Sequence, residues 1–281
     1  MTEQELYESV KIHLQQVYQG VFTQEAIEHH FLEHVETGAS EELLDMVRKT
    51  NSLKPGQRLL DLGCGFGTFV LLCLRNGIDA CGVEVADFDL DFARKRLRVE
   101  FPDCDPTRIY LQKDAQTTGL ENESFDVITA WNLLEHVPDY KQLIEEVYRL
   151  LKPGGYFFGI APNYLAFRKE AHYHLPWLPL FPRWIAKHYL QISGRRTEFF
   201  EQHIYYVTNW GILQSIKRTG FEIVDPDIIK LEKPDGIVSS FIRRWVDRFR
   251  SWRLISLVKL LIKIKFWNPF KQSVYWIGYK A

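Results

Sequence analysis

The sequence predicts an α/β fold, in which a mostly parallel seven-stranded sheet carries helices on both faces. Short apolar runs of strand length alternate with amphipathic stretches of about 10–15 residues, a rhythm typical of strand–helix–strand units. The first apolar run, "RLLDLG", is expected to be a buried strand, as the strands of a sheet covered on both faces are. With 281 residues, 46% of them hydrophobic, the chain is long enough to bury a full core.

The predicted elements follow one another in a regular order. Apolar spacing predicts helices over 3–19 and 23–50, and the turn "LKPGQ" ends the second of them. The strands are expected at 58–63, 78–85, 108–115, 124–132, 156–162, 221–229 and 273–281. The helices between them are expected at 68–77, 87–101, 140–155 and 207–220.

Two long segments interrupt this rhythm, and both are expected to form helices because structureless loops of such length are uncommon in compact domains. The first is rich in aromatic residues, proline and histidine, and the second is basic. The chain therefore divides into N-terminal helices that act as a lid (1–50), a core (51–162), an aromatic cap (163–205), a continuation of the core (206–231), a basic amphipathic insertion (232–271) and a final strand (272–281).

Charge is distributed unevenly along the chain. The whole protein has a net charge of −1, which argues against a general nucleic-acid-binding surface, whereas residues 238–271 contain nine Lys or Arg and one acid, Asp247. The tryptophans and aliphatic residues of this segment recur at helical spacing. Such a segment fits the surface of an anionic membrane, and it equally fits internal packing or an oligomer contact; nucleic acid is a weaker alternative.

The sequence also predicts where the protein resides. No apolar run approaches the roughly 20 residues of a membrane span, and the N-terminal stretch is polar and acidic, unlike a secretory signal. The four cysteines form no CxxC pair and are expected to be reduced, without a disulfide framework or a zinc site. We expect a cytoplasmic protein that is at most peripheral at the membrane.

A glycine-rich loop follows the first predicted strand, in "RLLDLGCGFGTF". Its glycines are Gly63, Gly65 and Gly67, whereas a dinucleotide fingerprint requires its third glycine at the position of Thr68. No Lys-Ser/Thr pair follows, so the loop is not a P-loop. Asp61, near the strand end, would repel a phosphate but attract a cation. The spacing therefore suits a tight turn beneath a ligand better than a phosphate cradle.

The stretch "LLDLGCGFGTF" resembles the first motif of class I S-adenosylmethionine-dependent methyltransferases of the small-molecule type. The later motifs agree in order: "CGVEV", "LQKDA", "FDVITAWNLLEHVPD", "LLKPGGYFFGIAPN", "GFEIVD" and "YWIGYKA". The resemblance is closest over residues 50–162 and looser over 203–229 and 272–281. It implies a Rossmann-like fold with helical cap insertions, an enzyme that uses S-adenosylmethionine as cosubstrate, and no metal.

The resemblance also implies a set of cofactor-binding residues. In this family the glycine loop packs against the methionine part, an acid here matched by Glu84 holds the ribose hydroxyls, and an acid matched by Asp114 lies near the adenine amine. The full set is Asp61, Gly63, Cys64, Gly65, Gly67, Glu84, Val85, Asp114, Ala115, Asn132 and Leu133. A strand–helix turn without a ligand is the alternative for the glycines, and a helix cap is the alternative for Asp114.

Three histidines are candidate catalytic residues, because alignment drives methyl transfer but a hydroxyl acceptor also needs a base. His136 follows the fourth strand in "LLEHVPD"; a capping or packing role is its alternative. The spacing of His172 and His174 would place both on one face of an extended strand. No acid or third histidine is evident in register with them, so we expect no metal there.

The predicted reaction is O-methylation of a small or lipid-linked acceptor, such as a glycolipid, a polyprenyl-linked sugar or a quinone precursor. The apolar cap and the basic segment motivate this expectation. The position after the fourth strand reads "WNLLEHVPD" rather than Asn/Asp-Pro-Pro-Tyr, which disfavours methylation of amide nitrogen and of nucleic-acid bases. The alternative function is a non-catalytic S-adenosylmethionine-binding partner or regulatory protein, and the oligomeric state is left open.

Overall fold

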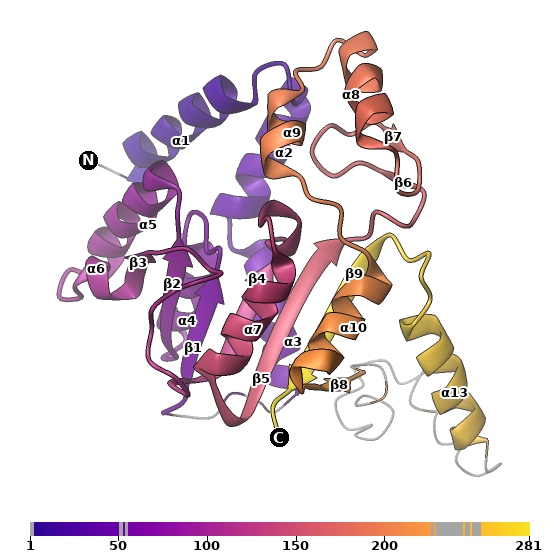
Figure 1. Cartoon of the computed structure of the whole chain (residues 1–281). Helices are drawn as coiled ribbons and strands as arrows, with labels where there is room; N and C mark the ends of the chain where they lie inside the picture. Colours follow the sequence, from indigo (N-terminus) through magenta and orange to yellow (C-terminus); the bar gives the residue numbers. More distant parts are fainter. Residues whose placement is uncertain are drawn as a thin grey trace.

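Seven strands form one sheet in the order β3-β2-β1-β4-β5-β9-β8 (Figure 1). The computed structural model describes residues 3–50, 53, 56–225, 228, 244, 248 and 254–281. The strands are β1 Arg58–Leu62, β2 Asp79–Glu84, β3 Tyr110–Gln112, β4 Phe125–Trp131, β5 Leu151–Pro162, β8 Glu222–Val224 and β9 Ser273–Tyr279. The first five are parallel, and β9 is antiparallel to both β5 and β8. The predicted fold class is therefore confirmed.

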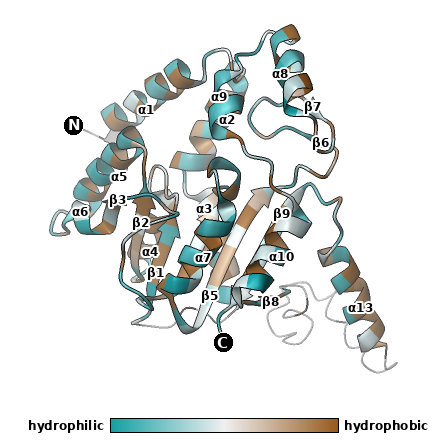
Figure 2. Cartoon of the chain, viewed as in Figure 1, coloured by the Kyte–Doolittle hydropathy of each residue, from teal (hydrophilic) through white to brown (hydrophobic). Residues whose placement is uncertain are grey.

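Alternate residues of the central strands are buried on opposite faces of this sheet. Leu59 of β1 packs with the first group of helices, and its neighbour Leu60 packs with the second group. The first group is α3 Gly38–Lys49, α4 Thr68–Arg75 and α5 Asp87–Glu100; the second includes α7 Tyr140–Leu150 and α10 Asn209–Thr219. Figure 2 shows hydrophobic residues along the sheet and hydrophilic ones on the outer side of α7. Burial on both faces explains why the strands are so apolar.

The remaining elements lie before, after and above this core. They are α1 Glu3–Tyr18, α2 Gln24–Val35, α6 Pro106–Ile109, the 3₁₀ turn η1 Leu134–His136, β6 Arg168–Lys169, β7 Pro176–Trp177, α8 Arg183–Ile192, α9 Glu198–His203 and α13 Ile255–Phe266. Helices α1 and α2, together with α8 and α9, lie beyond the carboxyl ends of the parallel strands (Figure 1). The N-terminal helices and the cap therefore face the same edge of the sheet.

Several predicted boundaries are wrong, for local reasons. The single helix expected over 23–50 is two helices, α2 and α3, separated by Glu36 and Thr37. The helix expected over 140–155 ends at Leu150, because Pro153 lacks an N–H and the N–H of Gly154 donates to the carbonyl of Lys280 (2.7 Å) in the sheet.

The third strand is also shorter than expected. The start of the predicted range 108–115 belongs to α6, whose first turn is capped by the carboxylate of Asp105 accepting from the N–H of Thr107 (3.0 Å). The strand ends at Gln112, so Asp114 lies two residues beyond it.

The aromatic cap has a core of its own. Tyr164, Tyr173 and Trp177 are fully buried, whereas Phe167 and Trp184 are exposed. The cap contains the short hairpin β6–β7 and the helices α8 and α9, as its length led us to expect.

In the basic insertion, α13 is described as a helix, and its remainder over 232–253 lies outside the described residues except for Arg244 and Arg248. The end of the strand predicted over 221–229 lies largely outside them as well. Across the part of the chain that the structure describes, no helix has the length and apolarity needed to cross a bilayer.

Candidate cofactor and acceptor site

The glycine loop connects β1 to α4 at the carboxyl edge of the sheet. Gly63, Gly65 and Gly67 have φ angles of 67°, 49° and 72°, in the left-handed region that favours glycine. A Cβ on Gly63 would lie 2.6 Å from Cδ1 of Leu133, and one on Gly67 would lie 2.5 Å from Cε1 of Tyr110. A Cβ on Gly65 would meet nothing within 4 Å. The outer glycines are therefore needed for packing, and the middle one faces open space.

Glu84 ties this loop to the end of β2. Its carboxylate accepts hydrogen bonds from the backbone N–H groups of Gly65 (3.0 Å), Val85 (2.7 Å) and Ala86 (3.0 Å). A carboxylate offers about four lone-pair positions, so further donors can still be accepted. The half-buried Glu84 thus fixes the loop and retains acceptor capacity for a ligand's hydroxyl groups.

Asp61 and Cys64 lie beneath the loop, not on its surface. Asp61 is 2% exposed and accepts a hydrogen bond from the Thr129 hydroxyl (2.6 Å). Burial raises the pKa of Asp61 to about 7; the bond from Thr129 opposes this rise and the charge of Glu84 adds to it. The Cys64 sulfur packs against Gly82, where an added Cβ would lie 2.6 Å away. Cys64 can therefore offer a ligand only backbone atoms.

The other predicted cofactor residues lie after the neighbouring strands. Asp114 is exposed, and its carboxylate accepts from the N–H of Gln116 (2.8 Å) in a turn; no helix begins there, so Asp114 is not a helix cap. Asn132, at φ 49°, donates its N–H to the carbonyl of Ile160 (2.8 Å). Val85 is exposed, Ala115 is buried and Leu133 packs against the glycine loop. The structure thus brings the predicted set to one edge of the sheet.

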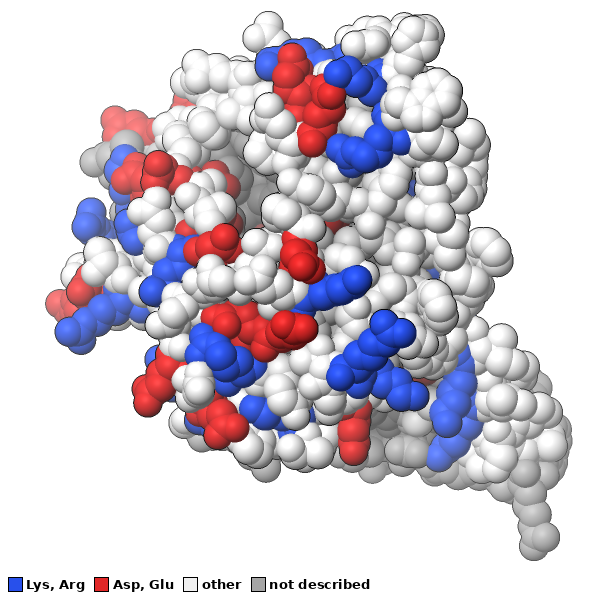
Figure 3. Space-filling model, in the orientation of Figure 1, with Lys and Arg blue, Asp and Glu red and all other residues white. Residues whose placement is uncertain are grey.

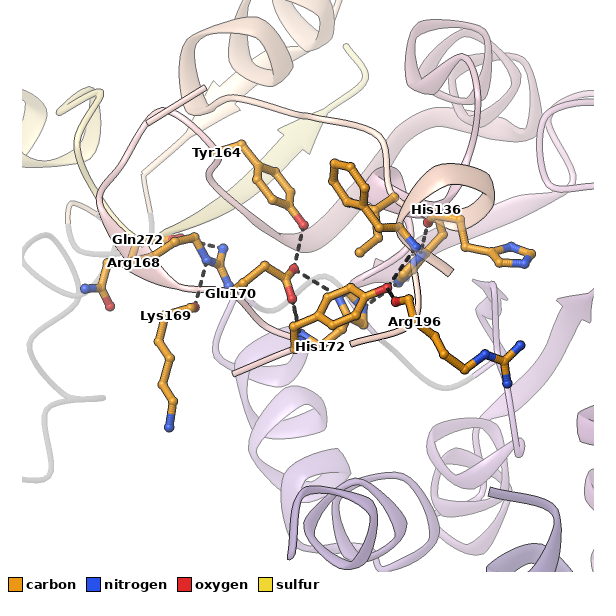
Figure 4. Close-up of polar contacts among 12 residues, drawn as sticks. His136, Tyr164, Arg168, Lys169, Glu170, His172, Arg196 and Gln272 are labelled. Atoms are coloured by element: carbon orange, nitrogen blue, oxygen red, sulfur yellow. Dashed lines mark hydrogen bonds and ion pairs between the residues drawn. The ribbon is translucent and has the colours of Figure 1, made fainter. Parts of the chain in front are cut away.

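His136 and His172, 36 residues apart in the sequence, meet above this edge (Figure 4). Their Nε2 atoms are 3.3 Å apart. Nδ1 of His136 lies 2.7 Å from the carbonyl oxygen of His203, and Nδ1 of His172 lies 3.1 Å from the carboxylate of Glu170. Because a carbonyl only accepts, Nδ1 of His136 carries the hydrogen, and its Nε2 is the acceptor while the ring is neutral.

The charges of this group follow from burial and contact. Burial and the charge of His172 lower the pKa of His136 to about 3. Burial also acts to lower the pKa of His172, but the charge and the hydrogen bond of Glu170 raise it overall. Burial opposes ionisation of Glu170, yet His172 and the neighbouring donors hold its pKa at about 2. Glu170 therefore favours the protonated form of His172, whereas burial favours the neutral form of the neighbouring His136.

His174 does not belong to this hydrogen-bonded chain, and the strand predicted for His172 and His174 is wrong. The carboxylate of Glu170 accepts from the N–H groups of His172 and Tyr173, and its carbonyl accepts from the N–H of His174 (3.0 Å). These bonds wind the segment into a turn. The His174 ring instead meets the edge of Phe22, with centroids 6.2 Å apart. In the described ranges, no cluster of three His, Cys, Asp or Glu side chains could hold a metal ion.

Sequence reasoning missed Glu170 and Glu135. Glu170 stands two residues before His172 in "KEAHYH", so the expectation that no acid lies near these histidines is wrong; the signal was present. Glu135 is 1% exposed, and burial raises its pKa to about 7. Its position beside His136 was visible, but its burial was not.

The chain is similar in sequence to known methyltransferases. Residues 31–225 match the family described as "Methyltransferase domain". The chain is 32% identical over 126 residues to phosphoethanolamine N-methyltransferase 2 of Caenorhabditis elegans, covering 43% of this chain and 27% of the relative. It is 33% identical over 116 residues to a ubiquinone biosynthesis O-methyltransferase of Actinobacillus pleuropneumoniae, covering 41% and 50%. The chain thus spans half or less of these curated relatives.

A solved structure supports the fold assignment. The phosphoethanolamine N-methyltransferase 2 of Haemonchus contortus, in complex with phosphomonomethylethanolamine and S-adenosylhomocysteine, is similar with a TM-score of 0.53 at 20% identity, covering 86% of this chain and 52% of that one. Identity at this level shows the fold alone. The family match, which covers most of the chain, together with the strand order described above, shows that the protein belongs to the class I methyltransferase-domain family.

Proposed function

We propose that the protein transfers a methyl group from S-adenosylmethionine to a hydroxyl oxygen of a small or lipid-linked acceptor, such as a quinone precursor, a glycolipid or a polyprenyl-linked sugar. One observation carries the proposal. The His136 imidazole stands in η1, five residues after the end of β4 and three beyond Leu133 at the glycine loop; its Nδ1 donates to the His203 carbonyl (2.7 Å), so its Nε2 is the acceptor that a hydroxyl proton needs.

The edge of the sheet suits S-adenosylmethionine, which carries a sulfonium cation and no phosphate. Glu84 would accept from the ribose hydroxyls, Asp114 would accept from the adenine amine, and the open space at Gly65 would admit the methionine part. When bound, this cosubstrate supplies an electrophilic methyl group. The chain's own residues would position the acceptor in line with that group, and positioning is worth several kcal/mol in displacement reactions.

Calorimetry with S-adenosylmethionine and S-adenosylhomocysteine tests the cofactor half of the proposal. We expect both to bind, and a protein that binds neither would contradict it. Methyl transfer from labelled S-adenosylmethionine to membrane-lipid extracts and to a catechol then tests the reaction. If the cosubstrate binds but is never consumed, the protein is a binding or regulatory partner and the catalytic proposal is wrong.

We further propose that α13 contacts an anionic membrane. Its exposed apolar residues, Leu257, Leu260, Leu261 and Ile264, follow the spacing of one helix stripe and are 52–60% exposed. The buried Phe266 holds the end of the helix to the core, where its carbonyl accepts from the Asn209 side chain (3.4 Å). The helix stands away from the body of the protein, with basic side chains along one side (Figure 3).

An outward apolar stripe on a basic segment is typical of helices that lie in the interface of anionic bilayers. Flotation with vesicles of phosphatidylglycerol and phosphatidylcholine tests this contact, with pure phosphatidylcholine vesicles as the control. We expect the wild type to float with the anionic vesicles and the double variant Leu261→Gln/Ile264→Gln to remain in solution. Equal flotation of the two proteins would contradict the membrane contact of this stripe, and a dimer that the variant abolishes would favour an oligomer contact instead.

A further inference from the structure

Glu170 is a buried carboxylate that binds donors on all sides. It is 1% exposed, and it lies in the turn between β6 and β7. Oε1 accepts from the Tyr164 hydroxyl (2.9 Å) and from Nδ1 of His172 (3.1 Å), and Oε2 accepts from the N–H groups of His172 (2.6 Å) and Tyr173 (2.7 Å). A buried charge is retained only where it is paired and hydrogen-bonded, and the His172 imidazole in contact with this carboxylate can carry the opposite charge.

The contacts fix which nitrogen carries each hydrogen (Figure 4). Glu170 takes the Nδ1 hydrogen of His172, and the His203 carbonyl takes the Nδ1 hydrogen of His136. The two Nε2 atoms then face each other, so a hydrogen on Nε2 of His172 points at the lone pair of His136. At 3.3 Å this is the longest of the hydrogen bonds that link Glu170, His172 and His136, and it lies beyond the usual range for a strong hydrogen bond. It is therefore the contact most easily replaced by a ligand.

We propose that a hydroxyl group of the acceptor replaces the direct contact between the two imidazoles, which move apart to admit it, donating to Nε2 of His136 and accepting from Nε2 of His172, and that Glu170 is a positioning residue which keeps His172 doubly protonated. This inference rests on the proposed function and assigns each ring a different part. His136 is the base, and His172 stabilises the negative charge that develops on the oxygen.

The step balances in atoms and charge. The acceptor's O–H bond breaks and its proton moves to Nε2 of His136, while the oxygen forms a bond to the methyl carbon as the carbon–sulfur bond of the donor breaks. His172 keeps its proton throughout. His136 releases the gained proton to solvent when the products leave.

This arrangement selects for a class of acceptor. A hydroxyl both donates and accepts, as the two facing nitrogens require, whereas a protonated amine has donors only and would be repelled by the cationic His172. The Phe199 ring lies 5.2 Å from the His172 ring and 6.2 Å from the His136 ring, centroid to centroid. Phe22 lies 6.3 Å from His172 in a stacked orientation. Aromatic neighbours favour a hydroxyl on a planar or apolar molecule over a fully hydrated one.

Nitrogen-15 NMR of the histidine side chains tests the inference without any activity assay. Single His136→Gln and His172→Gln variants assign the two rings. In the wild type at pH 7 we expect His172 to be doubly protonated and His136 to be neutral with its hydrogen on Nδ1. In Glu170→Gln the midpoint at which His172 loses its proton should fall by about 1–3 pH units, the effect of removing an adjacent opposite charge. Glu201→Gln, an exposed cap carboxylate paired with Lys187, is the control and should leave it unchanged.

Other charged or titratable groups also face His172. They are Glu135 from η1, Arg168 and His174 from the cap, and His30 from α2, while His203 from α9 faces His136. These groups are the same in the wild type and in Glu170→Gln. A difference between the His172 titrations of the two proteins is therefore caused by the loss of the Glu170 charge. A wild-type His172 that is neutral at pH 7 would overturn the inference, and this measurement needs no variant that must fold.

A ligand titration separates this inference from the proposed function. Catechol should shift the Nε2 signals of both rings, and benzylamine at neutral pH should not. Catechol that leaves both signals unmoved, or benzylamine that moves them equally, would refute the bridging hydroxyl. If the NMR results are as expected but labelled S-adenosylmethionine is never consumed, the proposed reaction fails while the hydroxyl site stands.

Discussion

Two carboxylates, Glu84 and Glu170, organise two halves of this site by different means. Glu84 accepts the N–H groups of the two residues that follow it and one from the glycine loop, all at the open end of β2. Glu170 accepts two nearby N–H groups in the same manner, but it is fully buried and adds a tyrosine hydroxyl and an imidazole. The first keeps capacity for a ligand, and the second directs a charged side chain toward His136.

The cofactor edge, which consists of the glycine loop and Glu84, is therefore preformed. The acceptor site, which consists of His136, His172 and Glu170, is instead assembled by tertiary packing. Groups at the cofactor edge are satisfied by local backbone contacts, so changes there should affect binding of the cosubstrate. The histidines come from different elements, so changes there should affect the methyl-transfer step.

The largest effect is expected for His136→Asn. Loss of the base should lower kcat by about 10²–10⁴-fold while the affinity for S-adenosylmethionine stays unchanged, because His136 lies outside the cofactor edge. Methyl transfer from labelled S-adenosylmethionine and calorimetry measure the two quantities. His174→Asn is the matched control from the neighbouring turn and should retain its rate. A His136→Asn enzyme that keeps its rate would show that this imidazole has only a packing role.

The glycine loop offers a comparison within the cofactor edge itself. Gly67→Ala should lower the free energy of unfolding by about 2–5 kcal/mol, because left-handed strain adds to overpacking against the buried Tyr110 ring. Gly65→Ala should cost only the strain, about 1–2 kcal/mol. Urea denaturation measures both.

Although Gly65→Ala should cost little stability, we expect it to weaken S-adenosylmethionine binding, because the added methyl group enters the open space beside the loop. Calorimetry on the folded variant measures this. Unchanged affinity would mean that the cofactor does not reach Gly65.

The contrast between the two halves explains what could be read from the sequence. The glycine loop directly follows β1, and Glu84 ends the next strand, 19 residues after Gly65, so this part of the site is built within one strand–helix–strand unit. The parallel pairing of the first five strands follows from the same alternation of strands and helices. The boundaries of β3 and β5 were missed because a capping acid, Asp105, and a pairing between Gly154 and Lys280 override simple periodicity.

The acceptor half could not be read in the same way. Whether His136 meets His172 depends on how the cap folds back over β4, which no local pattern encodes. Glu170 and His172 are close in the sequence, so their contact could have been predicted. Its effect on the pKa of His172 depends on the burial of Glu170, which the sequence does not show. Burial is a property of the whole fold, so these charges became visible only in the structure.

A smaller effect is expected for Glu84→Ala. Removal of the carboxylate leaves ribose hydroxyls and backbone N–H groups unpaired, which should weaken S-adenosylmethionine binding by about 1–3 kcal/mol. Calorimetry measures the change, and Asp87→Ala, an exposed acid in the first turn of α5, is the control. Equal affinities for Glu84→Ala and the wild type would mean that the ribose lies elsewhere and that Glu84 does not bind the cosubstrate.

The smallest effect concerns stability against pH. His30 and His136 are half-buried: burial and nearby histidines lower the pKa of His30 to about 2 and that of His136 to about 3. Because both folded pKa values lie below the unfolded value near 6.5, stability is present above pH 6.5 and is lost as pH falls. Each histidine contributes a slope of up to about 1.4 kcal/mol per pH unit below that point. His172, whose pKa is raised, changes stability in the opposite sense and offsets part of this loss.

Urea denaturation between pH 7.5 and 5 measures this slope, and His30→Phe isolates one contribution to it. The phenyl ring keeps the aromatic contacts of His30 with Tyr18 and Phe22 but cannot take a proton. The variant should therefore lose less stability per pH unit than the wild type, with little change at pH 7.5. If the two proteins lose stability in parallel, His30 is hydrated in the folded state, and the packing of the N-terminal helices against the cap histidines is looser than the ring contacts imply.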